Sequence, residues 1–295
     1  MPNYNDCLQQ LSRYTPCGSQ TLSKMANRYP EVYPKALDYG REGHVFDIEG
    51  REYIDLISGL GAVSVGYANT DVSLAAQLQL HKGVTFSLPT LLEAQVAERL
   101  TQLVPNTEMW KFGKNGTDGT VMAVRAARAF TKRTKIMTVG YNGCADQFEI
   151  KGVRNAGIPE ELKDTIVKAT YNDIDSFREL FSYEYACVLL EPMVVHYPEK
   201  HFLSDLRMIC DRTGTVLIFD EVVTGGRFDG FTAQSHFKVV PDLTVLSKGL
   251  ANGFPLCAVG GSRRIMSTFE RNDFFASGTF GGETEIGRAS CRERV

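Results

Sequence analysis

The strongest constraint on the fold of this 295-residue chain is a series of short, wholly apolar runs that alternate with segments of helical periodicity. A strand with one solvated face alternates polar and apolar residues, whereas these runs do not, so both of their faces are expected to be buried. Buried strands that alternate with helices predict an α/β fold with a mainly parallel sheet and helices on both of its faces. The predicted strands are Met109–Phe112, Lys135–Val139, Thr165–Ala169, Ala186–Leu190, Val216–Phe219, Leu243–Leu246 and Leu256–Val259, and the predicted helices are Asp71–His81, Thr90–Leu103, Asp118–Thr131, Asp173–Phe181 and Phe202–Thr213.

The composition is that of an ordinary folded protein, with 43% hydrophobic and 23% charged residues. No run approaches the roughly 18 apolar residues that a membrane span needs, and the polar stretch Met1–Gln10 lacks the apolar core of an export signal. Seven dispersed cysteines without a CxxC pair indicate reduced thiols and a cytoplasmic location. The net charge of −3 argues against a nucleic-acid partner.

The chain divides into three segments of different character. Residues 1–65 are irregular apart from a hairpin predicted at His44–Leu56. Residues 66–284 carry the alternation of strands and helices. Residues 285–295 read EIGRASCRERV, which we interpret as a translated adaptor scar rather than a natural basic tail. We therefore expect the natural protein to continue past Thr284.

The turn Gly113–Thr120 follows a predicted strand and leads into a predicted helix. The backbone N–H groups at a helix N-terminus, together with the Thr117 hydroxyl, suit a phosphate group. The alternative is a plain capped turn, because Thr117 is also a good N-cap residue. No GKS or GKT sequence closes the turn, so it is not a Walker A loop.

Two charged residues follow buried strands, at the edge where α/β sheets bind their ligands. Asp220 follows Val216–Phe219, and a carboxylate there needs a cationic partner, either a metal ion or a protonated heterocycle. No histidine cluster lies nearby, which disfavours a metal. Lys248 follows Leu243–Leu246 and precedes a glycine-rich segment. Partial burial would free its amine as a nucleophile, although a lysine at a helix start is the plainer alternative.

A phosphate turn, a strand-end Asp and a strand-end Lys are together what pyridoxal phosphate requires. The turn would hold the phosphate, Asp220 would keep the pyridine nitrogen protonated, and Lys248 would form the imine and move the proton at the substrate carbon. Tyr141 would stack on one face of the ring, and Val222 would pack on the other. These residues predict a pyridoxal-phosphate site.

The same residues belong to a longer set of motifs that resembles the class III pyridoxal-phosphate aminotransferases, in particular the branch similar to glutamate-1-semialdehyde 2,1-aminomutase. The matching segments are FGKNGTDGTVMAVRAAR, YNGCADQF, LLEPM, LIFDEVVTGGRF, LSKGLANGFPLCAVGG and SGTFGGET, with REGHVFDIEGREYIDLISG echoing the N-terminal pattern. The resemblance implies an aspartate-aminotransferase-like fold (PLP fold type I). In that fold, residues 66–284 form the cofactor-binding large domain. Residues 1–65 contribute to a small domain whose C-terminal part is missing.

The resemblance also implies a role for each matching residue. By this resemblance Lys248 is the Schiff-base lysine and Asp220 is the partner of the pyridine nitrogen. Thr279 reaches the phosphate of the neighbouring subunit, which implies a homodimer. The full set of implied cofactor-binding residues is Asn115, Gly116, Thr117, Tyr141, Glu191, Asp220, Val222, Lys248 and Thr279.

The substrate side departs from the aminomutase pattern. Lys24 stands where the aminomutase has the arginine that holds the substrate carboxylate, and Asn142 replaces the usual histidine. We therefore expect transamination between a small-molecule amino donor and a keto or aldehyde acceptor. Intramolecular amino transfer of the aminomutase type is one alternative, and a non-catalytic scaffold is an alternative of another class. Without the rest of the small domain, we expect residues 1–295 alone to be inactive.

Overall fold

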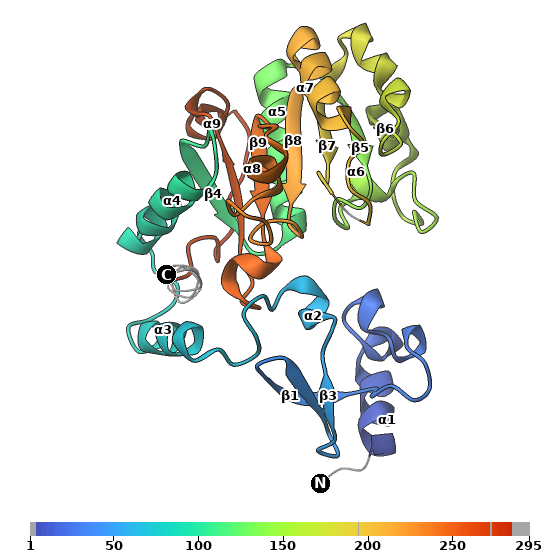
Figure 1. The fold of residues 1–295 in the computed structure, drawn as a ribbon, viewed down its shortest axis with the longest axis vertical. Helices are drawn as coiled ribbons and strands as arrows, with labels where there is room; N and C mark the ends of the chain where they lie inside the picture. The colour runs from blue at the N-terminus through green and yellow to red at the C-terminus, as the bar shows by residue number, and fades with distance from the viewer. Residues whose placement is uncertain (1–3, 194, 272, 285–295) are drawn as a thin grey trace. The chain divides into compact units, whose positions relative to one another are not determined.

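The computed structural model describes residues 4–193, 195–271 and 273–284 (Figure 1). The proposed adaptor scar at residues 285–295 lies outside the described residues. The chain forms two compact units, Met1–Thr70 and Asp71–Val295, each of which has its own sheet. None of the described helices is long and apolar enough to cross a bilayer.

The first unit is built around a three-stranded antiparallel sheet in the order β1-β2-β3. Strands β2 (His44–Asp47) and β3 (Glu52–Ile54) form the predicted hairpin, whereas β1 (Leu37–Arg41) is a strand that the sequence did not predict. Asp47 stabilises the turn of the hairpin by accepting two backbone N–H bonds, each of 2.9 Å. The other elements are α1 (Tyr4–Tyr14), η1 (Pro16–Gly18), η2 (Leu22–Lys24), η3 (Ala26–Arg28) and the single turn α2 (Ser58–Gly61).

The second unit contains a seven-stranded sheet in the order β4-β10-β9-β8-β7-β5-β6. The five strands from β9 to β6 are parallel, and β10 is antiparallel to both of its neighbours, β4 and β9. The prediction of a mainly parallel sheet is therefore confirmed. The strands are β4 (Met109–Gly113), β5 (Lys135–Val139), β6 (Ile166–Lys168), β7 (Tyr185–Leu190), β8 (Val216–Glu221), β9 (Leu243–Leu246) and β10 (Cys257–Gly261).

Helices connect these strands, and the predicted ones are found with small shifts at their ends. The helix predicted at Asp173–Phe181 is of the 3₁₀ type. The helices are α3 (Thr70–Leu80), α4 (Leu91–Leu103), α5 (Gly116–Thr131), α6 (Asp146–Glu149), η4 (Glu160–Thr165), η5 (Ile174–Ser182), α7 (Phe202–Thr213), α8 (Ala233–Phe237), η6 (Lys248–Ala251) and α9 (Arg263–Glu270).

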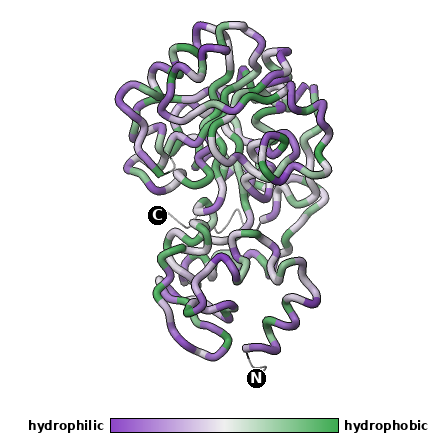
Figure 2. The backbone as a smooth tube through the Cα atoms, turned by 90° about the vertical axis from the view of Figure 1, so that its right-hand side faces the viewer, coloured by the Kyte–Doolittle hydropathy of each residue, from purple (hydrophilic) through white to green (hydrophobic). Residues whose placement is uncertain are grey.

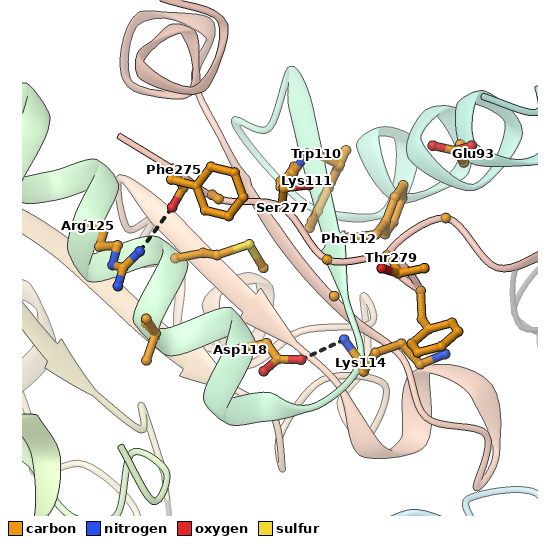
Figure 3. A pocket seen from close by; sticks show the side chains of 18 of the residues that line it. Glu93, Trp110, Lys111, Phe112, Lys114, Asp118, Arg125, Phe275, Ser277 and Thr279 are labelled. Atoms are coloured by element: carbon orange, nitrogen blue, oxygen red, sulfur yellow. Dashed lines mark hydrogen bonds between the residues drawn. The ribbon is translucent and has the colours of Figure 1, made fainter. Parts of the chain in front are cut away.

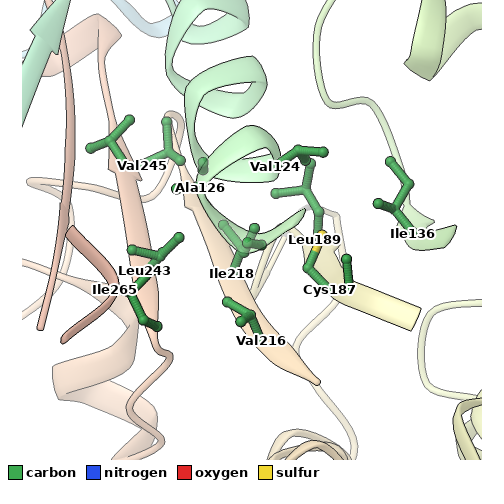
Figure 4. Packing of buried hydrophobic residues seen from close by; sticks show 14 of the residues in the cluster. Val124, Ala126, Ile136, Cys187, Leu189, Val216, Ile218, Leu243, Val245 and Ile265 are labelled. Atoms are coloured by element: carbon green, nitrogen blue, oxygen red, sulfur yellow. The ribbon is translucent and has the colours of Figure 1, made fainter. Parts of the chain in front are cut away.

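Alternate residues of the central strands enter two different cores, so both faces of the sheet are buried. On one face, Ile218 of β8 packs in a cluster with Val124 of α5 and Val245 of β9 (Figure 4). On the other face, Phe219 packs with residues of η5 and α7, including Leu206. Figure 2 shows the hydrophobic stretches gathered inside the larger unit. Because both faces of these strands are buried, polar and apolar residues do not alternate along them.

Helix α5 lies close to the sheet because small residues line its inner face. Gly119, Ala123 and Ala127 are buried. A Cβ atom on Gly119 would lie 2.5 Å from Val245 Cγ1, so glycine is needed for this approach. The position of α5 determines where its N-terminus, and the turn before it, meet the carboxyl edge of the sheet.

Candidate active site

The carboxyl ends of three adjacent strands bring three charged side chains together. Glu191 directly follows β7, Asp220 is the penultimate residue of β8, and Lys248 begins η6 after β9. Because these strands are parallel neighbours, their carboxyl ends meet at one edge of the sheet. The negative charges of Glu191 and Asp220 both act on the Lys248 ammonium.

Asp220 is a buried carboxyl group with only 4% of its surface exposed. Its Oδ1 accepts a hydrogen bond from the backbone N–H of Val222 at 3.2 Å, and its Oδ2 accepts one from Asn142 Nδ2 at 3.4 Å. Burial raises the pKa of Asp220 to about 6, although both hydrogen bonds and the charge of Lys248 oppose the shift. A cation placed against this carboxylate would favour its charged form.

Glu191 and Lys248 also have pKa values that differ from the ordinary ones. Burial, with the negative charge of Asp220 as a smaller contribution, raises the pKa of Glu191 to about 7. Burial lowers the pKa of Lys248, against the attraction of the two carboxylates. Lys248 also has a left-handed backbone, with φ of 45°. A cluster of perturbed groups at a sheet edge is typical of a functional site.

The turn before α5 is capped in a way that leaves the Thr117 hydroxyl available. The N-cap is Asn115, whose side chain accepts from the N–H of Asp118 at 3.1 Å, while Asp118 accepts from the Asn115 N–H. Thr117 is therefore not the cap, contrary to the plainer alternative for this residue. Its Oγ1 accepts from the backbone N–H of Cys144 at 3.2 Å and lies 3.8 Å from Cys144 Sγ, a contact in which either atom can be the donor.

The segment after β5 packs directly against this turn. Gly143 has φ of +113°, and a Cβ atom there would lie 2.6 Å from Thr117 Oγ1. On the other side, a Cβ atom on Gly116 would lie 3.0 Å from a methyl group of Val222. Tyr141, in the same segment, is 66% exposed. The structure thus brings the predicted phosphate turn next to the residues predicted to pack on the ring.

Two other predicted residues belong to segments outside this sheet edge in the sequence. Lys24 belongs to η2 of the first unit, where it is exposed. Thr279 lines a cavity of about 760 Å³ between α4, β4, α5 and the segment 275–282 (Figure 3). Thr117 also lines this cavity. Neither Lys248 nor Asp220 belongs to the lining of this cavity.

Sequence reasoning assigned no role to two residues that affect this cluster. Asn142 was noted only as a replacement, yet its side chain is buried and bonds to Asp220. Arg227, in the loop after β8, adds a positive charge that lowers the pKa of Lys248. The sequence did contain one signal for Arg227. The residue lies in the loop that follows the Asp220 strand, and loops at this edge of the sheet surround the ligand.

The chain is similar to known proteins over most of its length. The family Aminotransferase class-III matches residues 25–286. The glutamate-1-semialdehyde 2,1-aminomutase of Francisella philomiragia is 34% identical over 300 residues, which cover 95% of this chain and 69% of that protein.

Two solved structures with this fold are transaminases. An omega-transaminase from Sphaerobacter thermophilus has a TM-score of 0.91 and 32% identity, and the match covers 98% of this chain and 72% of that one. A transaminase with PLP bound has a TM-score of 0.89 and 28% identity, with coverage of 97% and 72%. Since the family match covers most of the sequence and the predicted fold is confirmed, this chain belongs to the class III aminotransferase family.

Proposed function

We propose that this chain supplies the pyridoxal-phosphate-binding residues of an enzyme that transfers an amino group between a small-molecule amino donor and a keto or aldehyde acceptor. The observation that carries the proposal is the convergence of Asp220, Glu191 and Lys248 at one sheet edge. Each group suits one part of the chemistry, and family membership supports the assignment.

The residues present fit this cofactor. Asp220 is a buried carboxylate that needs a cation, and a protonated ring nitrogen is one. The N-terminus of α5 offers backbone N–H groups and the Thr117 hydroxyl to a phosphate. Asn142 Oδ1 is buried without a hydrogen-bond partner among the described residues, as expected where a polar ligand is bound. Asn115, Gly116 and Thr117 would hold the phosphate.

When bound, pyridoxal phosphate supplies an electron sink for the pair of electrons left when a proton leaves the substrate carbon. The lowered pKa of Lys248 increases the fraction of neutral amine, which can act as nucleophile and as base at that carbon. Asp220 would hold the ring nitrogen in its protonated form. Tyr141 and Val222 would cover the two ring faces and exclude water.

Glu191 can hold a proton near Lys248. Its pKa of about 7 means that a substantial fraction of its carboxyl groups is protonated at neutral pH. When Lys248 gains a proton, the attraction between the two groups favours loss of the proton from Glu191. We therefore propose that Glu191 moderates the charge on Lys248 during proton transfer.

The first test is cofactor binding through Lys248. After unbound pyridoxal phosphate has been removed by gel filtration, the parent chain is expected to show a visible absorbance band that disappears on treatment with borohydride. The band should be absent in Lys248→Ala and intact in Lys163→Ala, which removes a lysine from a surface ion pair with Glu160. An unaltered band in Lys248→Ala would defeat the assignment of the nucleophile.

The aminomutase reaction is the second candidate, favoured by the name of the Francisella relative. An assay of the completed protein with glutamate-1-semialdehyde separates the two functions, because an aminomutase forms 5-aminolevulinate without an external acceptor. We expect little of this product, since Lys24 offers a point charge where the aminomutase pattern has a bidentate arginine. A scaffold without catalysis would instead show neither product nor the visible absorbance band.

Two properties of the assembly belong to the same proposal. We propose that the protein is a cytoplasmic homodimer in which Thr279 contacts the phosphate held by the neighbouring subunit. We also propose that residues 1–295 alone show no measurable turnover. Sedimentation and a half-transamination assay on this chain test both statements, and a dimeric, active 295-residue protein would contradict the second.

A further inference from the structure

Asn142 connects the turn after β5 to the carboxylate of Asp220. Its side chain is turned inward, and the residue is only 2% exposed. Nδ2 donates to Asp220 Oδ2 at 3.4 Å, while the backbone N–H of Val222 donates to Oδ1 at 3.2 Å. The two carboxylate oxygens therefore have donors from two different segments, and together these donors determine the plane of the carboxylate.

The position of Asn142 is itself fixed by α5. Its carbonyl oxygen accepts a hydrogen bond from Thr120 Oγ1 at 2.7 Å. The next residue, Gly143, contacts Thr117 so closely that an added Cβ atom would lie 2.6 Å from Thr117 Oγ1. Asn142 thus ties Asp220 to the same helix whose N-terminus forms the proposed phosphate site. A cofactor that spans both positions needs this spacing to be constant.

Packing alone does not explain the side-chain amide of Asn142. Asn142 Oδ1 has no hydrogen-bond partner among the residues that the structure describes. An unpaired buried acceptor costs about as much stability as one hydrogen bond contributes. An apolar side chain of similar size would avoid that cost, so the contribution of Asn142 lies in its effect on Asp220.

The charged and titratable groups that interact with Asp220 explain why an uncharged donor suits this position. Lys248 adds a positive charge, whereas Glu221 and Glu191 add negative charge, and the phenol of Tyr141 also interacts with Asp220. Several of these groups change charge with pH. The Asn142 amide does not, so it remains a hydrogen-bond donor to Asp220 at every pH in the working range.

We propose that Asn142 is a positioning residue, whose amide keeps the Asp220 carboxylate ionised and oriented toward the ring nitrogen of the cofactor. This inference rests on the proposed binding of pyridoxal phosphate. It predicts that loss of the amide changes the ionisation of Asp220 even when no cofactor is present.

The test compares Asn142→Leu with Thr138→Val. Thr138 is a matched control, because its Oγ1 is likewise buried without a partner and it lies on β5 just before the same turn. Infrared spectroscopy of the cofactor-free chain, labelled with carbon-13 at the Asp carboxyls, measures the pH midpoint of Asp220, with Asp220→Asn identifying its band. Thermal melting and binding of pyridoxal phosphate are measured on the same variants.

In Asn142→Leu, we expect the Asp220 midpoint to rise by about one pH unit, because the charged form loses a donor. Affinity for pyridoxal phosphate should fall at least ~10-fold, while the melting temperature at about pH 4, where Asp220 is protonated in both folded proteins, is unchanged or higher. Thr138→Val should leave the midpoint and the affinity unchanged. Asn142→Ala serves if the leucine variant does not fold.

Two outcomes would overturn the inference. One is an unmoved Asp220 midpoint in a folded Asn142 variant, and the other is a lowered melting temperature with unchanged affinity for pyridoxal phosphate. If the parent chain fails to bind pyridoxal phosphate, the proposed function fails, whereas the infrared midpoint still tests the coupling of Asn142 to Asp220. The two failures are therefore distinguishable.

Discussion

Two neighbouring carboxyl groups on β8 have different partners because side chains alternate across a strand. Asp220 belongs to the charged cluster with Lys248, and its hydrogen-bond donors leave room for a cation. Glu221 points to the other face and is fully buried. There it accepts hydrogen bonds from the backbone N–H groups of Ala233 and Gln234 at the start of α8. One carboxylate therefore faces the site and the other holds the loop that borders it.

At the scale of single residues, Gly143→Ala is expected to weaken binding of pyridoxal phosphate. The new Cβ atom would overlap Thr117, including its rigid Cβ and Cα atoms at 3.0 and 3.1 Å, and would push the Tyr141 turn away from α5. We expect affinity to fall at least ~10-fold, with about 1–3 kcal/mol of stability lost. Absorbance titration and denaturant unfolding measure the two effects.

Gly157→Ala is the control for Gly143→Ala. Gly157 also has a left-handed backbone, with φ of +86°, but an added Cβ would meet nothing within 4 Å. This variant should lose only about 1 kcal/mol of stability, from the strain of a left-handed backbone at an alanine. Its affinity for pyridoxal phosphate should be unchanged. Equal affinity in both variants would show that the contact with Thr117 does not shape the site.

The sequence was sufficient to find the residues that follow buried strands, but not their partners. Asp220 and Lys248 stand out because charge next to an apolar run is unusual. Asn142 does not, since an Asn before a Gly is also the usual composition of an exposed turn. Whether its side chain turns inward depends on the packing of α5 against β5, which no local pattern contains. Arg227 lies in an irregular loop, and its proximity to Lys248 likewise depends on the tertiary fold.

At the scale of secondary-structure elements, the carboxylate of Glu221 stabilises the connection between β8 and α8. It accepts four hydrogen bonds, because the Thr224 hydroxyl and the Gln234 side-chain amide also donate to it. We expect Glu221→Gln to lower the free energy of unfolding by about 2–3 kcal/mol, since the amide NH₂ would face N–H donors. Denaturant unfolding measures the change.

Glu108→Gln is the matched control for this element. Glu108 is exposed and accepts from the backbone N–H of Arg263 at the start of α9 at 2.8 Å, so it also caps a helix. In water the cost of losing that interaction should stay below about 1 kcal/mol. If the two substitutions lower the free energy of unfolding equally, burial of Glu221 does not determine how strongly its carboxylate stabilises the start of α8.

Strands buried on both faces were predictable because their apolar runs have no other stable environment. β1 was not predicted, since LDYGR contains a glycine and most of its residues are exposed. The antiparallel direction of β10 was also not predictable. It follows from the short connection after η6, which returns the chain beside β9 rather than crossing over a helix. Direction is thus a property of the connection, not of the strand sequence.

At the scale of the whole molecule, the charged cluster opposes the stability of the cofactor-free protein. Asp220 and Glu191 have pKa values of about 6 and about 7, above the ordinary 3.8 and 4.5. Between about pH 4 and pH 7 the folded state therefore binds more protons than the unfolded state, and stability falls as pH rises.

Asp47 and Asp55 affect stability at lower pH, and in the opposite direction. Hydrogen bonds outweigh burial and lower their pKa values, so their contribution is lost only as pH falls below about 4.

A double variant, Asp220→Asn with Glu191→Gln, isolates this effect because both replacements are uncharged and similar in shape. Without pyridoxal phosphate, the melting temperature of the parent should fall between pH 5 and pH 8 relative to that of the double variant, and each kcal/mol corresponds to on the order of 2–4 °C. Added pyridoxal phosphate should raise the parent's melting temperature at pH 8 more than the variant's, because a bound cation offsets the buried negative charge. Differential scanning calorimetry across the pH series measures both. Parallel curves for the two proteins would mean that these carboxyls ionise normally and that the cluster is more hydrated than its burial implies.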